Sequence, residues 1–171
     1  MENKIPSNLV IRPAQLEDVS AVVAGINAVC AEEIYFRTTQ FVSDPQWAMT
    51  FEQLGDNTER LVLVADLNDS IVGMVNIFPG STESRDAHAA ELGIHVLAPF
   101  RDRGVGTQLL RTALDWARDR KIEKITLSVF STNSRALYLY AKFGFEREGV
   151  RRKQYRIRGE YVDDILMAKF L

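Results

Sequence analysis

The chain has 171 residues, of which 46% are hydrophobic and 26% charged, and its formal net charge is -2 at pH 7. A chain of this length buries roughly two-thirds of its unfolded surface, so it can hold one core without a disulfide or a metal. The small net charge gives no reason to expect nucleic acid as a partner. No stretch approaches the roughly 20 apolar residues of a membrane span, and the opening MENKIPSNLV lacks the basic and apolar regions of a signal peptide. We therefore expect one cytoplasmic domain over residues 1–171, with no membrane or nucleic-acid partner.

Hydrophobic periodicity and turn residues predict a succession of strands and helices. The expected elements are a strand at 8–12, a helix at 14–29, a short helix at 44–54, a hairpin at 60–78, a strand at 89–98, helices at 107–120 and 133–142 on either side of a strand at 124–130, and a terminal hairpin at 145–170. The strand at 89–98 is almost continuously apolar, which predicts burial on both faces, and Pro99 ends it. The order predicts a mixed α/β fold around one sheet.

Between the strand at 89–98 and the next helix lie two glycines, Gly104 and Gly106, with Arg101 and Arg103 beside them. The first N–H groups of a helix have no partner within the helix, and the peptide dipoles add partial positive charge there. Glycine allows a tight turn and lets an anion approach the backbone. The stretch therefore predicts a phosphate-binding site at a helix N-terminus.

Two common phosphate motifs fit this stretch poorly. A P-loop needs four residues between its glycines and then Gly-Lys-Ser/Thr, which are absent here. A dinucleotide fingerprint needs a small residue three places after the second glycine, where Leu109 stands. The pattern that remains is Arg/Gln-x-x-Gly-x-Gly/Ala at Arg101, Gly104 and Gly106, and in this the chain resembles the GNAT superfamily of acyl-CoA-dependent N-acyltransferases.

A second stretch, NSRALYLYAKFGF, strengthens this resemblance. It is similar to the family signature Asn-x-x-Ala-x-x-Leu-Tyr-x-Lys-x-Gly-Phe at seven positions, which are Asn133, Ala136, Leu139, Tyr140, Lys142, Gly144 and Phe145. The resemblance implies a single-domain α/β (α+β) fold with a central, mixed and mostly antiparallel sheet of about seven strands, flanked by about four helices. It also implies an enzyme that moves an acetyl group from acetyl-CoA to a primary amine in a ternary complex, with no metal.

The resemblance assigns the cofactor-binding residues. The backbone N–H groups of Arg103, Gly104, Val105, Gly106 and Thr107 would hold the pyrophosphate of acetyl-CoA, with Arg101 and Arg103 as nearby charge. The strand that ends at Val96 would pair with the pantetheine arm, and its N–H would face the thioester oxygen. Asn133 would hydrogen-bond the same arm, while its ordinary role would be to cap its helix.

For catalysis, the resemblance favours Tyr140 as the general acid that protonates the departing thiolate; the alternative is a buried core tyrosine. Three candidates remain for the general base that deprotonates the amine: Glu91, His95 and water. Glu91 and His95 are four residues apart on a strand of period two, so their side chains point to the same face and either could take the proton directly or through water. Glu91 is the first candidate; the alternatives are an exposed or salt-bridged carboxylate for Glu91 and a satisfied buried imidazole for His95. Direct transfer needs no covalent enzyme intermediate, so Cys30, the single cysteine, is expected to be a small buried hydrophobe.

The terminal segment, residues 148–168, looks like the hairpin of bacterial members that act on free amino acids or protein N-termini. There Tyr161 could offer a ring to the acceptor and Asp163 could attract its ammonium group; ordinary hairpin packing is the alternative. The same region of the chain carries a cluster of cationic residues, and we interpret this cluster as one solvent-exposed face of a strand. Its members are Arg147, Arg151, Arg152, Lys153, Arg156 and Arg158. The leading acceptor is a small amino-acid-like amine, the alternatives being a protein N-terminus or an acyl-CoA-binding module without turnover, and by resemblance a homodimer is possible.

Overall fold

The computed structural model describes residues 5–42 and 60–171. They contain a seven-stranded sheet, three α-helices and two short 3-10 turns. The strands are β1 (Leu9–Pro13), β2 (Leu61–Leu67), β3 (Ile71–Pro79), β4 (Ala89–Val96), β5 (Lys124–Phe130), β6 (Glu146–Ile157) and β7 (Glu160–Phe170). The helices are α1 (Val19–Cys30), α3 (Val105–Asp119) and α4 (Ser134–Lys142), and the turns are Leu16–Asp18 and Ala98–Phe100. The expected helix at 44–54 lies outside the described residues.

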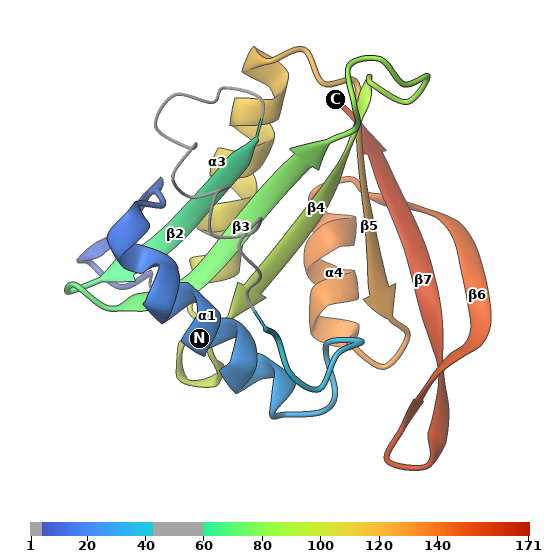
Figure 1. Ribbon diagram of the computed structural model, residues 1–171, viewed down its shortest axis with the longest axis horizontal. Helices are drawn as coiled ribbons and strands as arrows, with labels where there is room; N and C mark the ends of the chain where they lie inside the picture. The colour runs from blue at the N-terminus through green and yellow to red at the C-terminus, as the bar shows by residue number, and fades with distance from the viewer. Residues whose placement is uncertain (1–4, 43–59) are drawn as a thin grey trace.

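The sheet separates two layers of helix. Helix α1 crosses one face, while α3 and α4 cover the other, as Figure 1 shows. The larger core cluster lies between the sheet and the α3/α4 layer, and the smaller one lies under α1. The predicted apolar stripe of α3 is confirmed, because Leu109, Leu110, Ala113, Leu114 and Ala117 are all buried. Cys30 is buried at the end of α1, as expected.

The strand order is β1-β2-β3-β4-β5-β7-β6, and every neighbouring pair is antiparallel except β4 with β5. The mixed and mostly antiparallel sheet that the resemblance implied is therefore present. The parallel pair is short: it joins Ala89 to Lys124, Ala90 to Ile125 and Glu91 to Thr126. Beyond Glu91 the two strands diverge, and α4 is visible through the gap between them in Figure 1.

Two details differ from the expectations. Strand β4 is not buried on both faces: Glu91 is exposed, and Ile94 and Val96 are only partly buried. Ile94 and Val96 lie beyond the divergence from β5, where the strand borders a cleft instead of a neighbouring strand. Glu91 is still paired with Thr126 of β5, and its side chain is exposed on the face of the sheet. Helix α3 begins at Val105 and not at residue 107. Gly106 therefore belongs to the first helical turn, and Gly104, at φ +80°, is the residue that turns the chain into the helix.

Candidate active site

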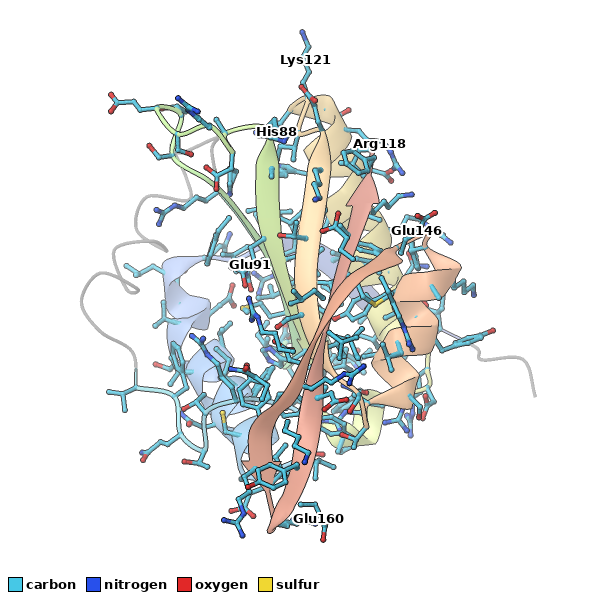
Figure 2. All side chains as sticks on the ribbon, turned by 90° about the vertical axis from the view of Figure 1, so that its right-hand side faces the viewer. His88, Glu91, Arg118, Lys121, Glu146 and Glu160 are labelled. Carbon is cyan, nitrogen blue, oxygen red and sulfur yellow. The ribbon has the colours of Figure 1, made fainter. Side chains whose placement is uncertain are left out.

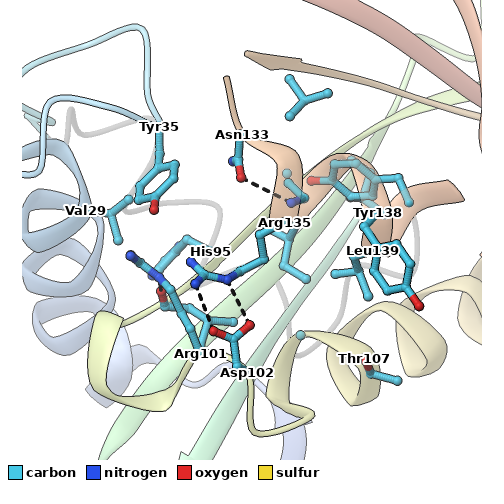
Figure 3. Close-up of a pocket in the computed structure, with 18 of the residues that line it drawn as sticks. Val29, Tyr35, His95, Arg101, Asp102, Thr107, Asn133, Arg135, Tyr138 and Leu139 are labelled. Carbon is cyan, nitrogen blue, oxygen red and sulfur yellow. Dashed lines mark hydrogen bonds and ion pairs between the residues drawn. The ribbon is translucent and has the colours of Figure 1, made fainter. Parts of the chain in front are cut away.

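A cleft of about 350 Å³ occupies the gap between the diverging halves of β4 and β5. Its walls come from β4, from β5, from the loop before α3 and from α4. Residues that the sequence singled out and that line it include His95, Val96, Arg101, Gly104, Gly106, Thr107, Asn133 and Tyr140. Segments far apart in the chain are thus brought around one cavity, as the close-up in Figure 3 shows.

The backbone of β4 offers hydrogen-bond donors to this cleft. The N–H of Leu97, just after β4, donates to the carbonyl of Val72 at 2.9 Å, so this N–H points toward β3. Backbone amides alternate sides along an antiparallel strand, and Ile94 and Val96 therefore turn their N–H groups away from β3, toward β5. No residue of β5 pairs with this part of β4 in the described sheet. The edge is open to a ligand that can add to it like a strand.

The N-terminus of α3 also borders the cleft and lies beside Val96, since a Cβ on Gly106 would come within 3.7 Å of the Val96 side chain. The N–H of Gln108 donates to the carbonyl of Gly104 at 3.0 Å, so the amides of Val105, Gly106 and Thr107 precede the first bond inside the helix. Within the described part of the chain, no side chain caps this end of the helix. A Cβ on Gly106 would meet Leu139 at 3.4 Å, an ordinary contact. Packing therefore tolerates a small side chain at position 106, and the open backbone is available to an anion.

The cations around this helix end differ from those that the sequence suggested. The guanidinium of Arg101 donates to both carboxylate oxygens of Glu32, at 2.7 and 2.5 Å, and to the carbonyl of Val96 at 2.8 Å. It is therefore already committed within the protein, although it lines the cleft. Arg103 is exposed and is absent from the described lining. Arg135, which the sequence analysis passed over, lines the cleft and donates to Asp102 at 2.9 and 2.8 Å (Figure 3).

Tyr140 and Asn133 both come from α4. Tyr140 is 6% exposed and lines the cleft. Burial raises the pKa of its phenol, so the hydroxyl is protonated throughout the neutral range. Among the described residues none forms a hydrogen bond to that hydroxyl. Asn133 accepts from the N–H of Ala136 at 3.1 Å and so caps α4, as predicted, while its side chain still lines the cleft.

A second cavity, of about 360 Å³, lies on the α1 face of the sheet. It shares Phe36, Gly93, Ile94 and His95 with the cleft. The two cavities therefore meet at one short stretch of β4. His95 is 7% exposed there, and burial, helped by the charge of Arg101, lowers its pKa to about 4. The imidazole is uncharged at neutral pH, packed against Gly25 of α1 and edge-on to Phe36.

The remaining predicted residues lie outside both cavities. Glu91 is exposed and projects on the side of the sheet that α1 occupies (Figure 2), the same side as His95. Tyr161 is 61% exposed, and its ring centroid lies 5.5 Å from the Lys153 Nζ and 5.8 Å from the Arg156 Cζ. Asp163 accepts from the backbone N–H of Lys153 at 2.7 Å. For Tyr161 and Asp163 the structure thus favours the alternative of hairpin packing.

The sequence analysis also missed Asn76 and Phe36, which line the second cavity. Asn76 carried a signal, because it is a single amide inside the otherwise apolar strand IVGMVNIFP. A polar group that is removed from water in such a strand normally has a hydrogen-bond partner, so a lone amide there points to a partner or a ligand. Phe36 carried no comparable signal, since the segment from residue 32 to 55 has no clear period.

Comparison with known proteins agrees with this geometry. Residues 28–145 match the model of the Acetyltransferase (GNAT) family. The chain is 35% identical over 168 residues to the L-amino acid N-acetyltransferase AaaT of Escherichia coli, covering 95% of this chain and 98% of that protein. It is 43% identical over 132 residues to the N-alpha-acetyltransferase RimI of Mycobacterium tuberculosis, covering 76% and 78% of the two chains. The structure of yncA from Salmonella typhimurium, solved with its cofactor acetyl-CoA, shares the fold at a TM-score of 0.86 and 19% identity, over 96% of this chain and 95% of that one.

The chain therefore belongs to the GNAT family of acetyltransferases, and it is an enzyme of the N-acetyltransferase type. The resemblance inferred from the two short motifs is confirmed. None of the helices within residues 5–42 and 60–171 is long and apolar enough to cross a membrane.

Proposed function

We propose that this enzyme transfers an acetyl group from acetyl-CoA to the primary amine of a small, amino-acid-like acceptor, directly and within a ternary complex. One observation carries the proposal: the cleft that suits acetyl-CoA and the second cavity meet at Gly93, Ile94 and His95 of β4. Two substrates held in the two cavities would face each other across this stretch. Direct transfer needs this proximity more than it needs a nucleophile from the protein.

The residues of the cleft fit acetyl-CoA. The open edge of β4, with the amides of Ile94 and Val96, suits the extended pantetheine arm. The amides at the start of α3 suit the pyrophosphate, and Asn133 lines the same cleft with an amide nitrogen that forms no hydrogen bond to a described residue. When bound, acetyl-CoA supplies an activated thioester, whose carbon–sulfur bond is exchanged for a carbon–nitrogen bond.

In this proposal the protein donates hydrogen bonds and moves protons. The N–H of Val96 stabilises the negative charge that develops on the thioester oxygen. Tyr140 donates its phenolic proton to the sulfur as the thiolate leaves, which requires a phenol that stays protonated until then, and the raised pKa of Tyr140 meets that requirement.

The amine must lose a proton, and we assign this task to Glu91 acting through water. Glu91 and His95 lie on the same side of β4, with Gly93 between them on the floor of the second cavity. His95 is the weaker candidate, because a pKa of about 4 makes its imidazole a poor proton acceptor at neutral pH. An exposed carboxylate with a water between itself and the amine is the better match.

A protein N-terminus is the second acceptor that we consider, since the RimI relative is named an N-alpha-acetyltransferase. A small amino-acid-like acceptor is favoured because the match to AaaT, named for L-amino acids, extends over nearly the whole of both chains. Binding of acetyl-CoA without turnover is disfavoured by Tyr140, which places a proton donor in the cleft. Pairing of two copies as a homodimer remains a prediction.

The proposal is tested by following thiol release from acetyl-CoA with panels of amino acids, polyamines, aminoglycosides and short peptides. We expect release with amino acids, and a decrease in kcat of about 100-fold for Tyr140→Phe with little change in the affinity for acetyl-CoA. Tyr155→Phe is a matched control, because that phenol lies on β6 and lines neither cavity. Release with peptides alone would favour the N-terminal acceptor, and binding without release from any amine would contradict the proposed enzyme activity.

A further inference from the structure

The second cavity has an unusual composition for a gap in a core. Its lining is largely apolar and rich in aromatic rings, with Ile26, Phe36, Phe41, Val62, Met74, Phe78 and Ile94. Only four other side chains in the described lining can form hydrogen bonds, and these are Arg37, Thr38, Asn76 and His95. An apolar cavity with a few polar groups is the usual form of a small-molecule site.

Asn76 is a polar group within the sheet that is only half-buried. It lies opposite Gly93 on the neighbouring strand, and its side chain covers the space that a Cβ on Gly93 would fill, 2.7 Å from the Asn76 Oδ1 atom. In the described part of the chain, the Asn76 amide forms no side-chain hydrogen bond. A half-buried amide among apolar neighbours loses hydrogen bonds to water without replacing them. A ligand that accepts from the amide nitrogen would restore them.

Arg37 supplies a positive charge at the same cavity. Its side chain is exposed, and within residues 5–42 and 60–171 it forms no ion pair. No aspartate or glutamate belongs to the described lining. His95 adds no charge at neutral pH. The cavity is therefore apolar and locally cationic, which favours an acceptor with a carboxylate and disfavours a polyamine.

We propose that the second cavity binds a neutral α-amino acid with an apolar side chain, and that Asn76 and Arg37 recognise its carboxylate. The acceptor side chain lies against the ring-rich wall of Phe36, Phe41 and Phe78. The amide nitrogen of Asn76 donates to the carboxylate, and the guanidinium of Arg37 neutralises it. The acceptor amine is then directed to the stretch of β4 shared with the cleft. This inference rests on the proposed acetyl transfer and assigns the acceptor class to it.

The test compares leucine with isopentylamine, which has the same side chain and amine but no carboxylate, in the presence of acetyl-CoA. For Asn76→Asp, we expect the KM for leucine to rise at least about tenfold, because a carboxylate would replace the donor, while the kcat/KM for isopentylamine falls by less than about threefold. Arg37→Met should raise the KM for leucine in the same selective manner. Because Arg37 is exposed, that variant does not endanger folding. Asn8→Asp is the matched control, since Asn8 is exposed on the approach to β1 and lines neither cavity.

Three results would overturn the inference. These are equal losses on leucine and isopentylamine in both variants, no loss in either variant, and a wild-type preference for lysine, glutamate or spermidine over leucine, methionine and phenylalanine. The affinity for acetyl-CoA and the Tm, measured for each variant, identify a loss due to misfolding. If the wild-type enzyme releases no thiol with any amine, it is the proposed function that fails, and the inference fails with it.

Discussion

Arg135 and Asp102 form a two-bond ion pair that joins the first turn of α4 to the loop before α3. Both residues line the cleft, and both are substantially exposed, at 49% and 62% of their side chains. An exposed ion pair contributes only about 0–1 kcal/mol to stability, so Arg135 can exchange its partner at little cost. Asp102 holds the guanidinium in the cleft that the start of α3 also borders, where we propose that the phosphates of acetyl-CoA bind.

This relationship predicts opposite effects of the two partners on cosubstrate binding. Arg135→Met should weaken the binding of acetyl-CoA about tenfold, because a charge-assisted contact to phosphate is lost. Asp102→Asn should leave binding unchanged or tighten it, because a negative charge near the phosphates is removed. Isothermal titration calorimetry measures both, with Arg111→Met as an exposed control on α3. Equal weakening by both variants would mean that the pair acts only as a structural link.

Glu91 should be required for catalysis and not for binding. Glu91→Gln removes the proton acceptor while keeping the shape of the side chain, so kcat should fall by at least about tenfold with the affinity for acetyl-CoA unchanged. Steady-state kinetics with leucine gives the first quantity and calorimetry the second. Glu123→Gln, before β5, is a control of the same chemistry. Full activity of the Glu91 variant would contradict the assignment of Glu91 as the base and would favour water acting without it.

The stability of the protein should depend on pH through His95. Its pKa in the folded state, about 4, lies below the ordinary value of 6.5, so the unfolded state binds more protons between these two values. The free energy of unfolding should therefore fall as the pH is lowered from about 6.5 to 4. Urea titrations at several pH values give the free energy of unfolding as a function of pH. For His95→Gln the slope of this function should be smaller, by an amount that corresponds to at most one proton per molecule. An unchanged slope would show that the imidazole is not held in its neutral form.

A second stability prediction concerns the start of the chain. Arg12 of β1 donates to Asp18 at 2.7 and 2.9 Å and to Asp66 of β2 at 3.1 and 3.0 Å. The hydrogen bond from Arg12 lowers the pKa of Asp18, whose side chain is only 9% exposed. Arg12→Met should reduce the free energy of unfolding by about 2 kcal/mol, because it leaves two carboxylates unpaired, one of them buried.

Denaturant unfolding measures this loss, and Arg118→Met provides the comparison. The ion pair of Arg118 with Asp115 is exposed on α3, so its removal should cost less than about 1 kcal/mol. Equal losses in the two variants would contradict the importance of burial at Asp18. The Arg12 variant should also lose less stability than the wild type when the pH is lowered through the acidic range, since its Asp18 no longer has a strongly depressed pKa.

Local patterns in the sequence determined much of this protein. The stripe on α3, the cap at Asn133, the placement of Tyr140 on α4 and the glycine at the entry to α3 all follow from residues close together in the chain. Hydrophobic periodicity and helix capping depend on residues that are close together in the chain, so they can be recognised in the sequence alone. The glycine motif and the seven-position motif on α4 were together specific enough to identify the family as well.

Only the tertiary structure decided which side chains face the site. It showed that Arg101 is committed to Glu32, 69 residues away, and that Arg135 lines the cleft and is held by Asp102, 33 residues away. It also showed that β4 leaves β5 after Glu91 and that Asn76 covers Gly93. Strand pairing and ion pairs of this kind depend on segments that are distant in sequence, and the energy of each contact depends on what is buried around it. Local propensity contains no information on either, which is why the second cavity could be found only in the folded chain.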